Sequence, residues 1–465
     1  MQRRNLKKEK FHIIEETLDD KYKILYFPNS KRFFKVNDKA IELIKDISDD
    51  TAVDIIGSKY GVSKETVENY KKKFQEYEKT VEENFPGETN KENKNVLGRL
   101  VLHLANGCNL RCMYCYANGG TYHSENQLMD KKTVDQAIKK IYSKFDHILG
   151  IQLFGGEPLL NLDMMEYICS KFSEYDPEVE FGIVTNGTLI NEQFIQIAKK
   201  YNIHTTISYD GDYNINNKLR IKVDGTGASN DILKAAKKFR EETGLLELIE
   251  ATYTQIHYDH GVTILDVLKD IEKELPGIPV HLAPAGGSEI DSYVLKDLAP
   301  FVDSVDEIFN ENAKENNKEF TYSLMQRIVY SIVHKTPGSQ YICDAGIGTL
   351  SISVKGDVYP CFMFTDQEEY RLGNIWDDNL FDSKKCRNVL KKIQEFNDKN
   401  RNKECNDCFI KNICNGCLGL NSMNTNSTEL VMDKKTCDMF RKMTERVLVQ
   451  LADISQKTKE GDDNF

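Results

Sequence analysis

Cys108-Asn-Leu-Arg-Cys112-Met-Tyr-Cys115 carries three cysteines separated by three and two residues, directly after the apolar run Leu102-His-Leu-Ala105. A four-iron cluster has four corners, and this short loop can supply thiolates to three of them. The fourth iron would then be free to bind a small molecule. A structural zinc site, or three unrelated cysteines, is the alternative interpretation of the same residues.

The residues around these cysteines, Asn-Leu-Arg and Tyr-Cys-Tyr, favour the cluster. With this spacing they resemble the cluster loop of the radical S-adenosylmethionine (SAM) superfamily. In that family the open iron chelates the amino and carboxylate groups of SAM, and electron transfer splits SAM into methionine and a 5′-deoxyadenosyl radical. The resemblance implies that Cys108, Cys112 and Cys115 hold a catalytic [4Fe-4S] cluster. It also implies an electron donor such as a flavodoxin or ferredoxin.

Composition describes an ordinary globular chain and excludes several other classes. The chain has 465 residues, 40% hydrophobic and 29% charged, enough for about three domains. No apolar run approaches the ~20 residues of a membrane span, and the net charge of −11 argues against a nucleic-acid surface. The basic start Met1–Lys10 is followed by no apolar signal segment, so a cytoplasmic location is expected. Twelve cysteines in a reducing compartment then indicate metal or redox chemistry.

Residues 1–82 are predicted to form a small winged-helix module. Two short strands, Tyr22–Phe27 and Arg32–Val36, precede three helical patterns, the first of them with Asp38 as its expected N-cap. Such modules usually bind DNA, but the last helix carries several glutamates, which suit phosphate poorly. Given the cluster loop, the module resembles the PqqD-like recognition element of enzymes that mature ribosomally made peptides, where a leader peptide adds as a strand to the sheet edge. Residues 83–97 are polar and are predicted to be a linker.

Residues 98–316 alternate short strands with helices, a pattern that predicts a parallel sheet. The expected strands are Leu100–Ala105, Gly150–Phe154, Glu180–Thr185, His204–Tyr209, Leu248–Thr254 and Pro279–Ala283. Six units are too few for a closed eight-fold barrel. We therefore predict an α/β fold of the partial (β/α)6 TIM-barrel type that is typical of the radical SAM family, with ligands at the C-terminal ends of the strands.

Several polar or glycine-rich motifs fall at those strand ends. By the family resemblance they are expected to contact SAM, although each alone would more often be structural. Glycines allow close backbone approach, a carboxylate can accept the SAM ammonium, and an arginine can pair with the SAM carboxylate. The expected SAM-binding residues are Tyr114, Gly155, Gly156, Glu157, Asn186, Ser208, Asp210, Arg220 and Glu250. Tyr116 is a further candidate beside the adenine.

Seven more cysteines lie between residues 343 and 437. Thr349–Val354 and Val358–Cys361 read as a hairpin with a turn at Gly356 and a cysteine at each side. Residues 317–341 are expected to be a helical bridge, 342–440 a C-terminal cysteine-rich domain, and 441–465 a helix and tail. The array resembles the SPASM domain, which holds two auxiliary iron–sulfur clusters; zinc is the alternative for closely spaced cysteine pairs. The gap Cys414-Asn-Gly-Cys417 is one residue shorter than usual in that family.

The family's crossed pattern implies how these seven cysteines divide. Cys405, Cys408, Cys414 and Cys437 would complete one [4Fe-4S] cluster, while Cys343, Cys361 and Cys417 would hold the other, making three clusters in all. The latter set is one thiolate short, because residues 334–341 lack the eighth cysteine of related sulfatase maturases. An open iron there could bind a substrate thiolate; alternatively Asp344, water or another side chain fills the corner. The helical spacing of Cys169 and Cys386 with apolar residues makes both core cysteines.

These features together predict a radical SAM/SPASM peptide maturase, closest in appearance to the thioether-forming sactipeptide and SCIFF-type enzymes. It would form a 5′-deoxyadenosyl radical and join a cysteine sulfur of a precursor peptide to a peptide carbon. The alternatives within the enzyme class are a streptide-like carbon–carbon crosslink and, less in keeping with the N-terminal module, an anaerobic sulfatase maturase. Outside the class, a zinc-bearing winged-helix DNA regulator remains open.

Overall fold

The computed structural model describes residues 10–19, 21–79, 95–314 and 319–462, with side chains described as far as 455. Most of the expected linker at 83–97 and of the basic start therefore lies outside the described residues. No described helix is long and apolar enough to cross a membrane.

The N-terminal module contains a three-stranded antiparallel sheet and three helices. The strands β1 (His12–Ile14), β2 (Lys23–Phe27) and β3 (Arg32–Val36) are ordered β1-β2-β3, and α1 (Asp38–Ser48), α2 (Val53–Tyr60) and α3 (Lys64–Glu78) follow. Sequence analysis missed β1, which is only three residues long. The prediction that Asp38 is the N-cap of α1 is wrong. Asn37 is the N-cap, because its side chain accepts a hydrogen bond from the Ala40 amide. The winged-helix assignment stays a prediction.

The module has its own apolar core between sheet and helices. Phe27 of β2, Ile56 of α2 and Phe74 of α3 are almost completely buried there. The ring of Tyr77 on α3 stacks on Phe34 of β3 at 5.2 Å between centroids. The last helix therefore lies against the sheet.

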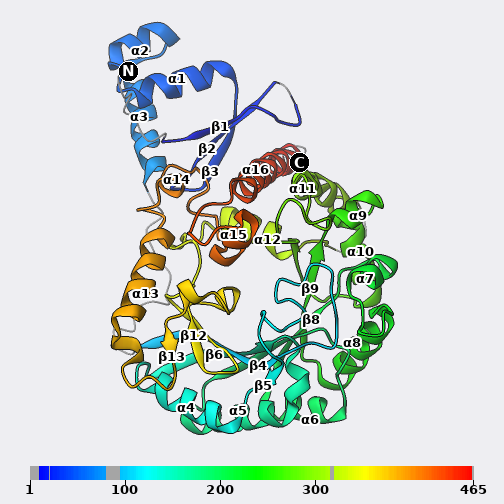
Figure 1. Cartoon of the computed structure of the whole chain (residues 1–465). Coiled ribbons are helices and arrows are strands. Elements are labelled where there is room, and N and C mark those ends of the chain that lie inside the picture. The colour runs from blue at the N-terminus through cyan, green and yellow to red at the C-terminus, as the bar shows by residue number, and fades with distance from the viewer. Residues whose placement is uncertain (1–9, 20, 80–94, 315–318, 463–465) are drawn as a thin grey trace.

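The central domain is built on the six parallel strands that the sequence predicts. They run in chain order across the sheet, as β4 (Val96–Asn106), β6 (His147–Gly155), β7 (Glu180–Thr185), β8 (His204–Ser208), β9 (Leu246–Tyr253) and β10 (Val280–Pro284). Helices follow the strands and cover the outside of the curved sheet (Figure 1). The helices of this part are α4 (Lys131–Tyr142), α5 (Leu162–Tyr175), α6 (Glu192–Tyr201), α7 (Tyr213–Leu219), α8 (Ser229–Thr243), α9 (Gln255–Asp259), α10 (Ile264–Glu274), α11 (Ala299–Asn312) and α12 (Ser323–Val333). The partial barrel itself stays a prediction.

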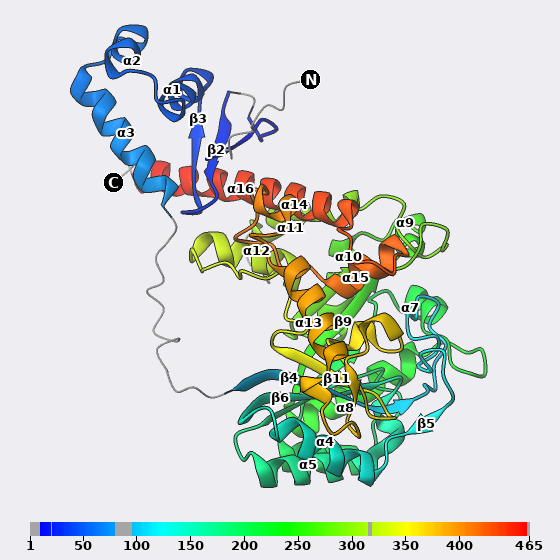
Figure 2. The ribbon, with the colours of Figure 1, turned by 60° about the vertical axis from the view of Figure 1, so that its left-hand side comes forward.

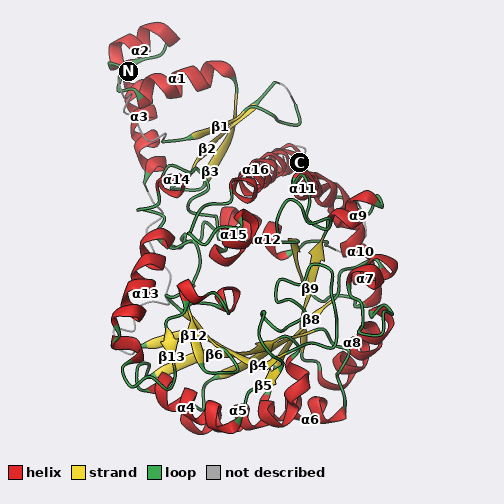
Figure 3. Ribbon diagram, viewed as in Figure 1, coloured by secondary structure: helices red, strands yellow, loops and turns green. Residues whose placement is uncertain are grey.

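The C-terminal cysteine-rich region continues the same sheet. Its strand β11 (Thr349–Ile352) pairs in parallel with β4, and β12 (Asp357–Tyr359) and β13 (Gly373–Asn374) follow as antiparallel neighbours. The predicted hairpin is confirmed, with its turn at Gly356. The pairing of β11 with β4 could not be read from the sequence. Figure 2 labels the two strands next to each other, and Figure 3 shows the strands of the sheet as yellow arrows. The short strand β5 (Gln127–Leu128) pairs with the end of β4.

The remaining helices are α13 (Lys384–Asn397), α14 (Lys403–Asn406), α15 (Leu418–Thr425) and α16 (Lys434–Asp462). The long helix α16 begins before the expected domain boundary at 440 and carries Cys437. It lies under the sheet of the N-terminal module (Figure 2). His12 bonds to Glu445 at 2.7 Å and Lys35 to Asp453 at 3.3 Å, and these contacts fix the module on the body.

Candidate active site and cysteine centres

The loop of Cys108, Cys112 and Cys115 leaves the end of β4 and docks on the segment after α7. The Met113 amide donates to the Leu219 carbonyl at 2.9 Å, and the Arg111 amide to the Ile221 carbonyl at 2.6 Å. These main-chain bonds fix the loop independently of any ligand.

Gly155 and Gly156, at the end of β6, allow this loop to approach the sheet closely. A Cβ on Gly156 would lie 2.1 Å from the Gly107 carbonyl oxygen, and one on Gly155 would lie 2.5 Å from that of Ala105. Gly155 also has φ of +132°, which favours glycine. The sequence predicted close approach of a ligand at these glycines. The structure shows that Ala105 of β4 approaches Gly155 and that Gly107, at the start of the cysteine loop, approaches Gly156.

Glu157 is 1% exposed and connects two strand ends. Its carboxylate accepts hydrogen bonds from the Thr185 hydroxyl at 2.7 Å, the Asn186 amide at 2.9 Å and the Leu159 amide at 3.0 Å. Burial nevertheless raises its pKa to about 7. Three bonds leave room for one more donor at this carboxylate, so its expected contact with an ammonium group stays a prediction.

Asn186 at the end of β7 contacts the cysteine loop directly. Its side-chain amide donates to the Asn109 side chain at 2.9 Å and lies 3.6 Å from the Cys108 sulfur. The side-chain oxygen Oδ1 of Asn186 in turn accepts hydrogen bonds from the main-chain amide and the hydroxyl of Thr188. Hydrogen bonds to cluster sulfurs are one way in which proteins adjust reduction potential.

Asp210, Arg220 and Tyr114 form a buried network beside the loop. Arg220 donates two hydrogen bonds of 2.9 Å to the Asp210 carboxylate, which also accepts from the Tyr114 hydroxyl at 2.5 Å and the Thr252 amide at 2.9 Å. The guanidinium lies 5.5 Å from the Tyr114 ring centre. The structure therefore brings three predicted site residues together. In this arrangement Asp210 orients Arg220, and the remaining guanidinium N–H groups stay available to an anion.

Ser208 and Glu250 are neighbours in the register of β8 and β9. Glu250 also lies near Tyr116, whose pKa is raised chiefly by burial and to a smaller extent by this carboxylate. All predicted SAM-binding residues thus lie at or beside the C-terminal ends of the parallel strands.

The three thiols of the loop suit a cationic metal group. Burial raises the pKa of Cys108 to about 12, with smaller contributions from Glu157 and the two other cysteines of the loop. Burial also raises that of Cys112 to about 11 although Arg220 opposes it. Because metals bind the thiolate, iron would supply the positive charge that these buried sulfurs need.

The second thiol group lies beside β11 and comprises Cys343, Cys361 and Cys417. Burial raises the pKa of Cys361 to about 12, with contributions from Cys417 and Cys343, while Arg99 of β4 lowers it. Cys417 is the N-cap of α15, and its sulfur accepts from the Leu420 amide at 3.4 Å. Positive backbone and guanidinium groups therefore face these sulfurs.

The third thiol group comprises Cys405, Cys408, Cys414 and Cys437, which we call the tetrad. The pKa of Cys437 is raised to about 12 by burial and by the three other cysteines. All four line one cavity of about 40 Å³, together with Lys399 and Arg441. The members of each C-terminal group thus lie near one another, and their assignment to two clusters stays a prediction.

Cys169 and Cys386 are fully buried in the main apolar core, as the sequence predicts. In the described part of the chain, no three His, Cys, Asp or Glu side chains are arranged to hold a single metal ion. A cluster asks for a different arrangement, since each thiolate binds a different iron.

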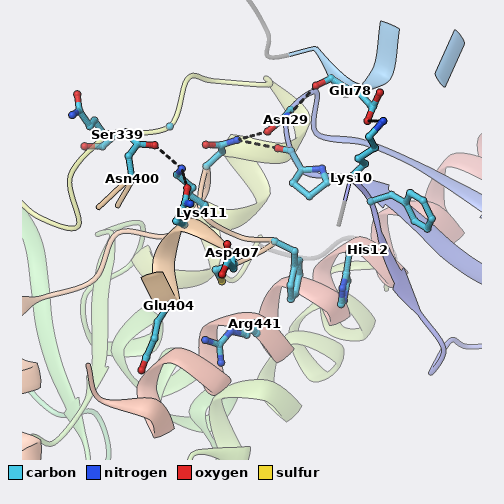
Figure 4. Close-up of a pocket in the computed structure, with 18 residues that line it drawn as sticks. Lys10, His12, Asn29, Glu78, Ser339, Asn400, Glu404, Asp407, Lys411 and Arg441 are labelled. Atoms are coloured by element: carbon cyan, nitrogen blue, oxygen red, sulfur yellow. Dashed lines mark hydrogen bonds and ion pairs between the residues drawn. The ribbon is translucent and has the colours of Figure 1, made fainter. Parts of the chain in front are cut away.

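A cavity of about 800 Å³ is lined by residues of the N-terminal module and of the loop that carries Cys408. Figure 4 shows Ser339 and Asn400 on one side and Lys10 and Glu78 on the other. Cys408 lines this cavity too. The ring of Phe409 stacks on His12 of the module at 3.7 Å, so the tetrad loop and the module are in direct contact.

Sequence reasoning missed several charged or aromatic residues around these thiols. Arg99 lies near Cys361, which is distant in sequence, while Lys399 and Arg441 lie near cysteines of the tetrad. His103 of β4 is buried between Tyr122 and Phe154, and burial lowers its pKa to about 3. No sequence pattern distinguishes these residues from others of the same type.

Comparison with known proteins identifies the class. Residues 102–273 match the radical SAM superfamily, and residues 343–409 match SPASM, an iron–sulfur cluster-binding domain. The chain therefore contains a radical SAM domain followed by a SPASM domain, and it is an enzyme of the SAM-dependent, 4Fe-4S iron–sulfur class.

Two curated relatives and one solved structure are similar to large parts of the chain. The radical SAM cyclopropyl synthase TigE of Paramaledivibacter caminithermalis is 26% identical over 75% of this chain and 73% of its own. The cysteine-type anaerobic sulfatase-maturating enzyme of Clostridium novyi is 24% identical over 77% of this chain and 97% of its own. The structure of Streptococcus suis SuiB bound to precursor peptide SuiA superposes with a TM-score of 0.50 and 18% identity, covering 91% of this chain and 97% of SuiB.

Proposed function

We propose that this protein matures a ribosomally synthesised peptide by radical chemistry and joins a cysteine sulfur to a carbon of that peptide. The observation that carries the proposal is the division of ten cysteines into groups of three, three and four. Under the proposal each group holds a [4Fe-4S] cluster. The cluster at Cys108, Cys112 and Cys115 supplies the electron that splits SAM.

The residues around the first group are assigned to SAM. Arg220, held by Asp210, pairs with the carboxylate of SAM, and Glu157 accepts its ammonium. Asn186, Ser208 and Glu250 lie where the nucleoside would be bound. A flavodoxin or ferredoxin is the proposed electron donor.

The group of Cys343, Cys361 and Cys417 is proposed to bind the substrate thiol. Cys169 and Cys386 lie in the apolar core, so neither completes this set. A thiolate of the peptide can then take the fourth position, which lowers its pKa and fixes it for bond formation. Forming the thioether removes one hydrogen atom from carbon, which the 5′-deoxyadenosyl radical takes up, and one proton from sulfur. The remaining electron would pass to the auxiliary clusters.

The N-terminal module is proposed to bind the leader of the precursor peptide. The SuiB match covers 91% of this chain, too large a share to omit all of residues 1–82, and that structure contains a precursor peptide. A leader held by the module raises the local concentration of the core peptide at the active site, to the order of mM for a short tether.

A carbon–carbon link is the second candidate. The observation in its favour is the relative named a cyclopropyl synthase, whose alignment covers 75% of this chain at 26% identity. Such a reaction would not need an open position in the second thiol group. The sulfatase-maturating relatives are a further alternative, but the N-terminal module has no evident role in that activity.

The test uses a cysteine-bearing peptide encoded beside the gene, treated anaerobically with reconstituted enzyme, SAM and reductant. Mass spectrometry before and after thiol alkylation reads the product. Loss of two hydrogens per link together with loss of alkylatable thiols is expected. The same mass loss with every thiol still alkylatable would favour the carbon–carbon link. SAM cleavage with an unchanged peptide would contradict the proposed substrate.

A further inference from the structure

Two lysine ammonium groups are buried, one beside the tetrad and one in the N-terminal module. Lys399, which follows α13, is 1% exposed. Its ammonium donates to the carbonyl oxygens of Ser339 at 3.1 Å, Lys411 at 3.0 Å and Cys414 at 2.6 Å. An ammonium has three N–H donors and a neutral amine has two, so three acceptors require the charged form.

Lys31 is the second buried ammonium and belongs to the N-terminal module. It lies in the turn between β2 and β3 and is 2% exposed. Its ammonium donates to the Ser331 hydroxyl at 2.6 Å and to the Thr336 carbonyl. Within the described residues, neither Lys31 nor Lys399 forms an ion pair with a carboxylate.

A single loop joins the two ammonium groups. Lys31 binds it at Thr336 and Lys399 binds it at Ser339, three residues further on. The two charges are close enough that Lys399, in addition to burial, lowers the pKa of Lys31 to about 8. Burial lowers the pKa of Lys399, and the neighbouring Cys414, Cys405 and Cys408 act in the opposite direction and raise it.

A buried cation is costly unless an anion compensates it, and two neighbouring cations are more costly still. The tetrad is the anion-forming group beside Lys399, and Lys31 is joined to Lys399 through the loop that both lysines bind. Four thiolates around an iron–sulfur cluster carry net negative charge, and reduction adds one more. Net charge around a cluster is one of the determinants of its potential.

We propose that Lys399 and Lys31 are the counter-charges of the cluster held by Cys405, Cys408, Cys414 and Cys437. Through Lys31 the N-terminal module is an electrostatic part of that centre. The inference rests on the proposed assignment of a cluster to the tetrad. Both cations favour the reduced cluster. By reciprocity, reduction of the cluster strengthens docking of the module on the body.

The experiment is an EPR-monitored redox titration of the full-length reconstituted enzyme, with the tetrad signal assigned by its loss in Cys437→Ala. Lys31→Met is expected to raise the ratio of oxidised to reduced cluster at fixed potential about tenfold, which is 59 mV for one electron. Lys31→Arg should stay near the wild-type value. Lys59→Met is the matched control, because it removes a lysine of the same module that pairs with Asp46 at its surface.

Two results separate this inference from the proposed function. Zinc in place of iron at the tetrad would overturn the cluster assignment and the counter-charge role together. Iron content equal to wild type, with Lys31→Met titrating like Lys59→Met, would overturn the counter-charge role alone.

A second measurement does not depend on the stability of a variant. Hydrogen exchange of residues 10–79 in the wild-type enzyme is expected to be slower when the clusters are reduced than when they are oxidised. Equal exchange in both states would contradict the proposed coupling between the module and the tetrad.

Discussion

At the residue scale, the candidate site contains buried ionisable groups, of which some are paired with an opposite charge and one is bound by neutral donors. Asp210 and Arg220 are both nearly inaccessible and satisfy each other through two hydrogen bonds. Glu157 is equally buried, but the donors to its carboxylate among the described residues are neutral. The two carboxylates should therefore respond differently to mutation and to pH.

Arg220→Ala is expected to destabilise the protein by about 3–5 kcal/mol, because it leaves the Asp210 carboxylate buried and unpaired. Arg220→Lys keeps the charge but loses the two-pronged geometry, so a smaller loss is expected. Anaerobic chemical denaturation of both variants measures this difference. Equal stability of wild type and Arg220→Ala would contradict a closed ion pair.

Because the pKa of Glu157 is raised, the stability of the protein without SAM is expected to depend on pH. Burial raises its folded pKa to about 7, above the unfolded value, so the folded state binds more protons between about pH 4.5 and 7. Its contribution to stability is present at low pH and is lost as pH rises through 7, with a limiting slope of ~1.4 kcal/mol per unit. Denaturation midpoints from pH 5 to 8, compared with Glu157→Gln, measure it. Parallel pH profiles for the two proteins would rule this titration out.

At the element scale, main-chain contacts between strand ends hold the cysteine loop. At the end of β6, Gly155 meets the backbone of Ala105, and Gly156 meets the backbone of Gly107 and Gly120. The Glu157 amide donates to the Gly107 carbonyl at 2.9 Å. A loop fixed by backbone atoms of neighbouring strands tolerates little displacement, since no flexible side chain can move aside.

Gly156→Ala should therefore displace the cysteine loop and lower the iron content by roughly one cluster of the proposed three. Gly150→Ala is the matched control on the same strand, because its Cβ would meet its nearest neighbour, the Glu180 carbonyl, at an ordinary 3.9 Å. Iron analysis and cleavage of SAM read the result. Full iron content in Gly156→Ala would show that the close approach is dispensable.

At the scale of the whole molecule, one sheet and one long helix connect three parts of the chain. The pairing of β11 with β4 brings the second thiol group next to the strand that carries the first. Helix α16 supplies Cys437 to the tetrad and, along its length, contacts the N-terminal module. The shared sheet and helix α16 therefore connect the N-terminal module, the cysteine loop after β4 and the C-terminal cysteine-rich region.

Phe409→Ala is expected to weaken that connection. It removes the ring that stacks on His12 and touches the edge of Tyr26, at a cost of about 1–3 kcal/mol for a partly buried aromatic residue. Under the proposed function, peptide modification should fall several-fold while SAM cleavage without peptide is unchanged. Trp376→Ala, at an exposed position, is the control. Equal losses in both activities would contradict a role confined to the module interface.

The sequence by itself determined the chemistry and the local elements of this protein. Cysteine spacing and hydrophobic periodicity are local properties, so they predicted the cysteine loop, the six parallel strands and the hairpin. Asn37 in place of Asp38 as an N-cap, and the short β1, lie at the limit of such signals.

Only the tertiary structure decided which distant residues meet. The pairing of β11 with β4, the approach of Gly107 to Gly156, and the burial of Lys31 beside Lys399 all join segments far apart in the chain. Such contacts depend on packing of the whole chain, and a lysine that will be buried has no local pattern that separates it from one that stays in water.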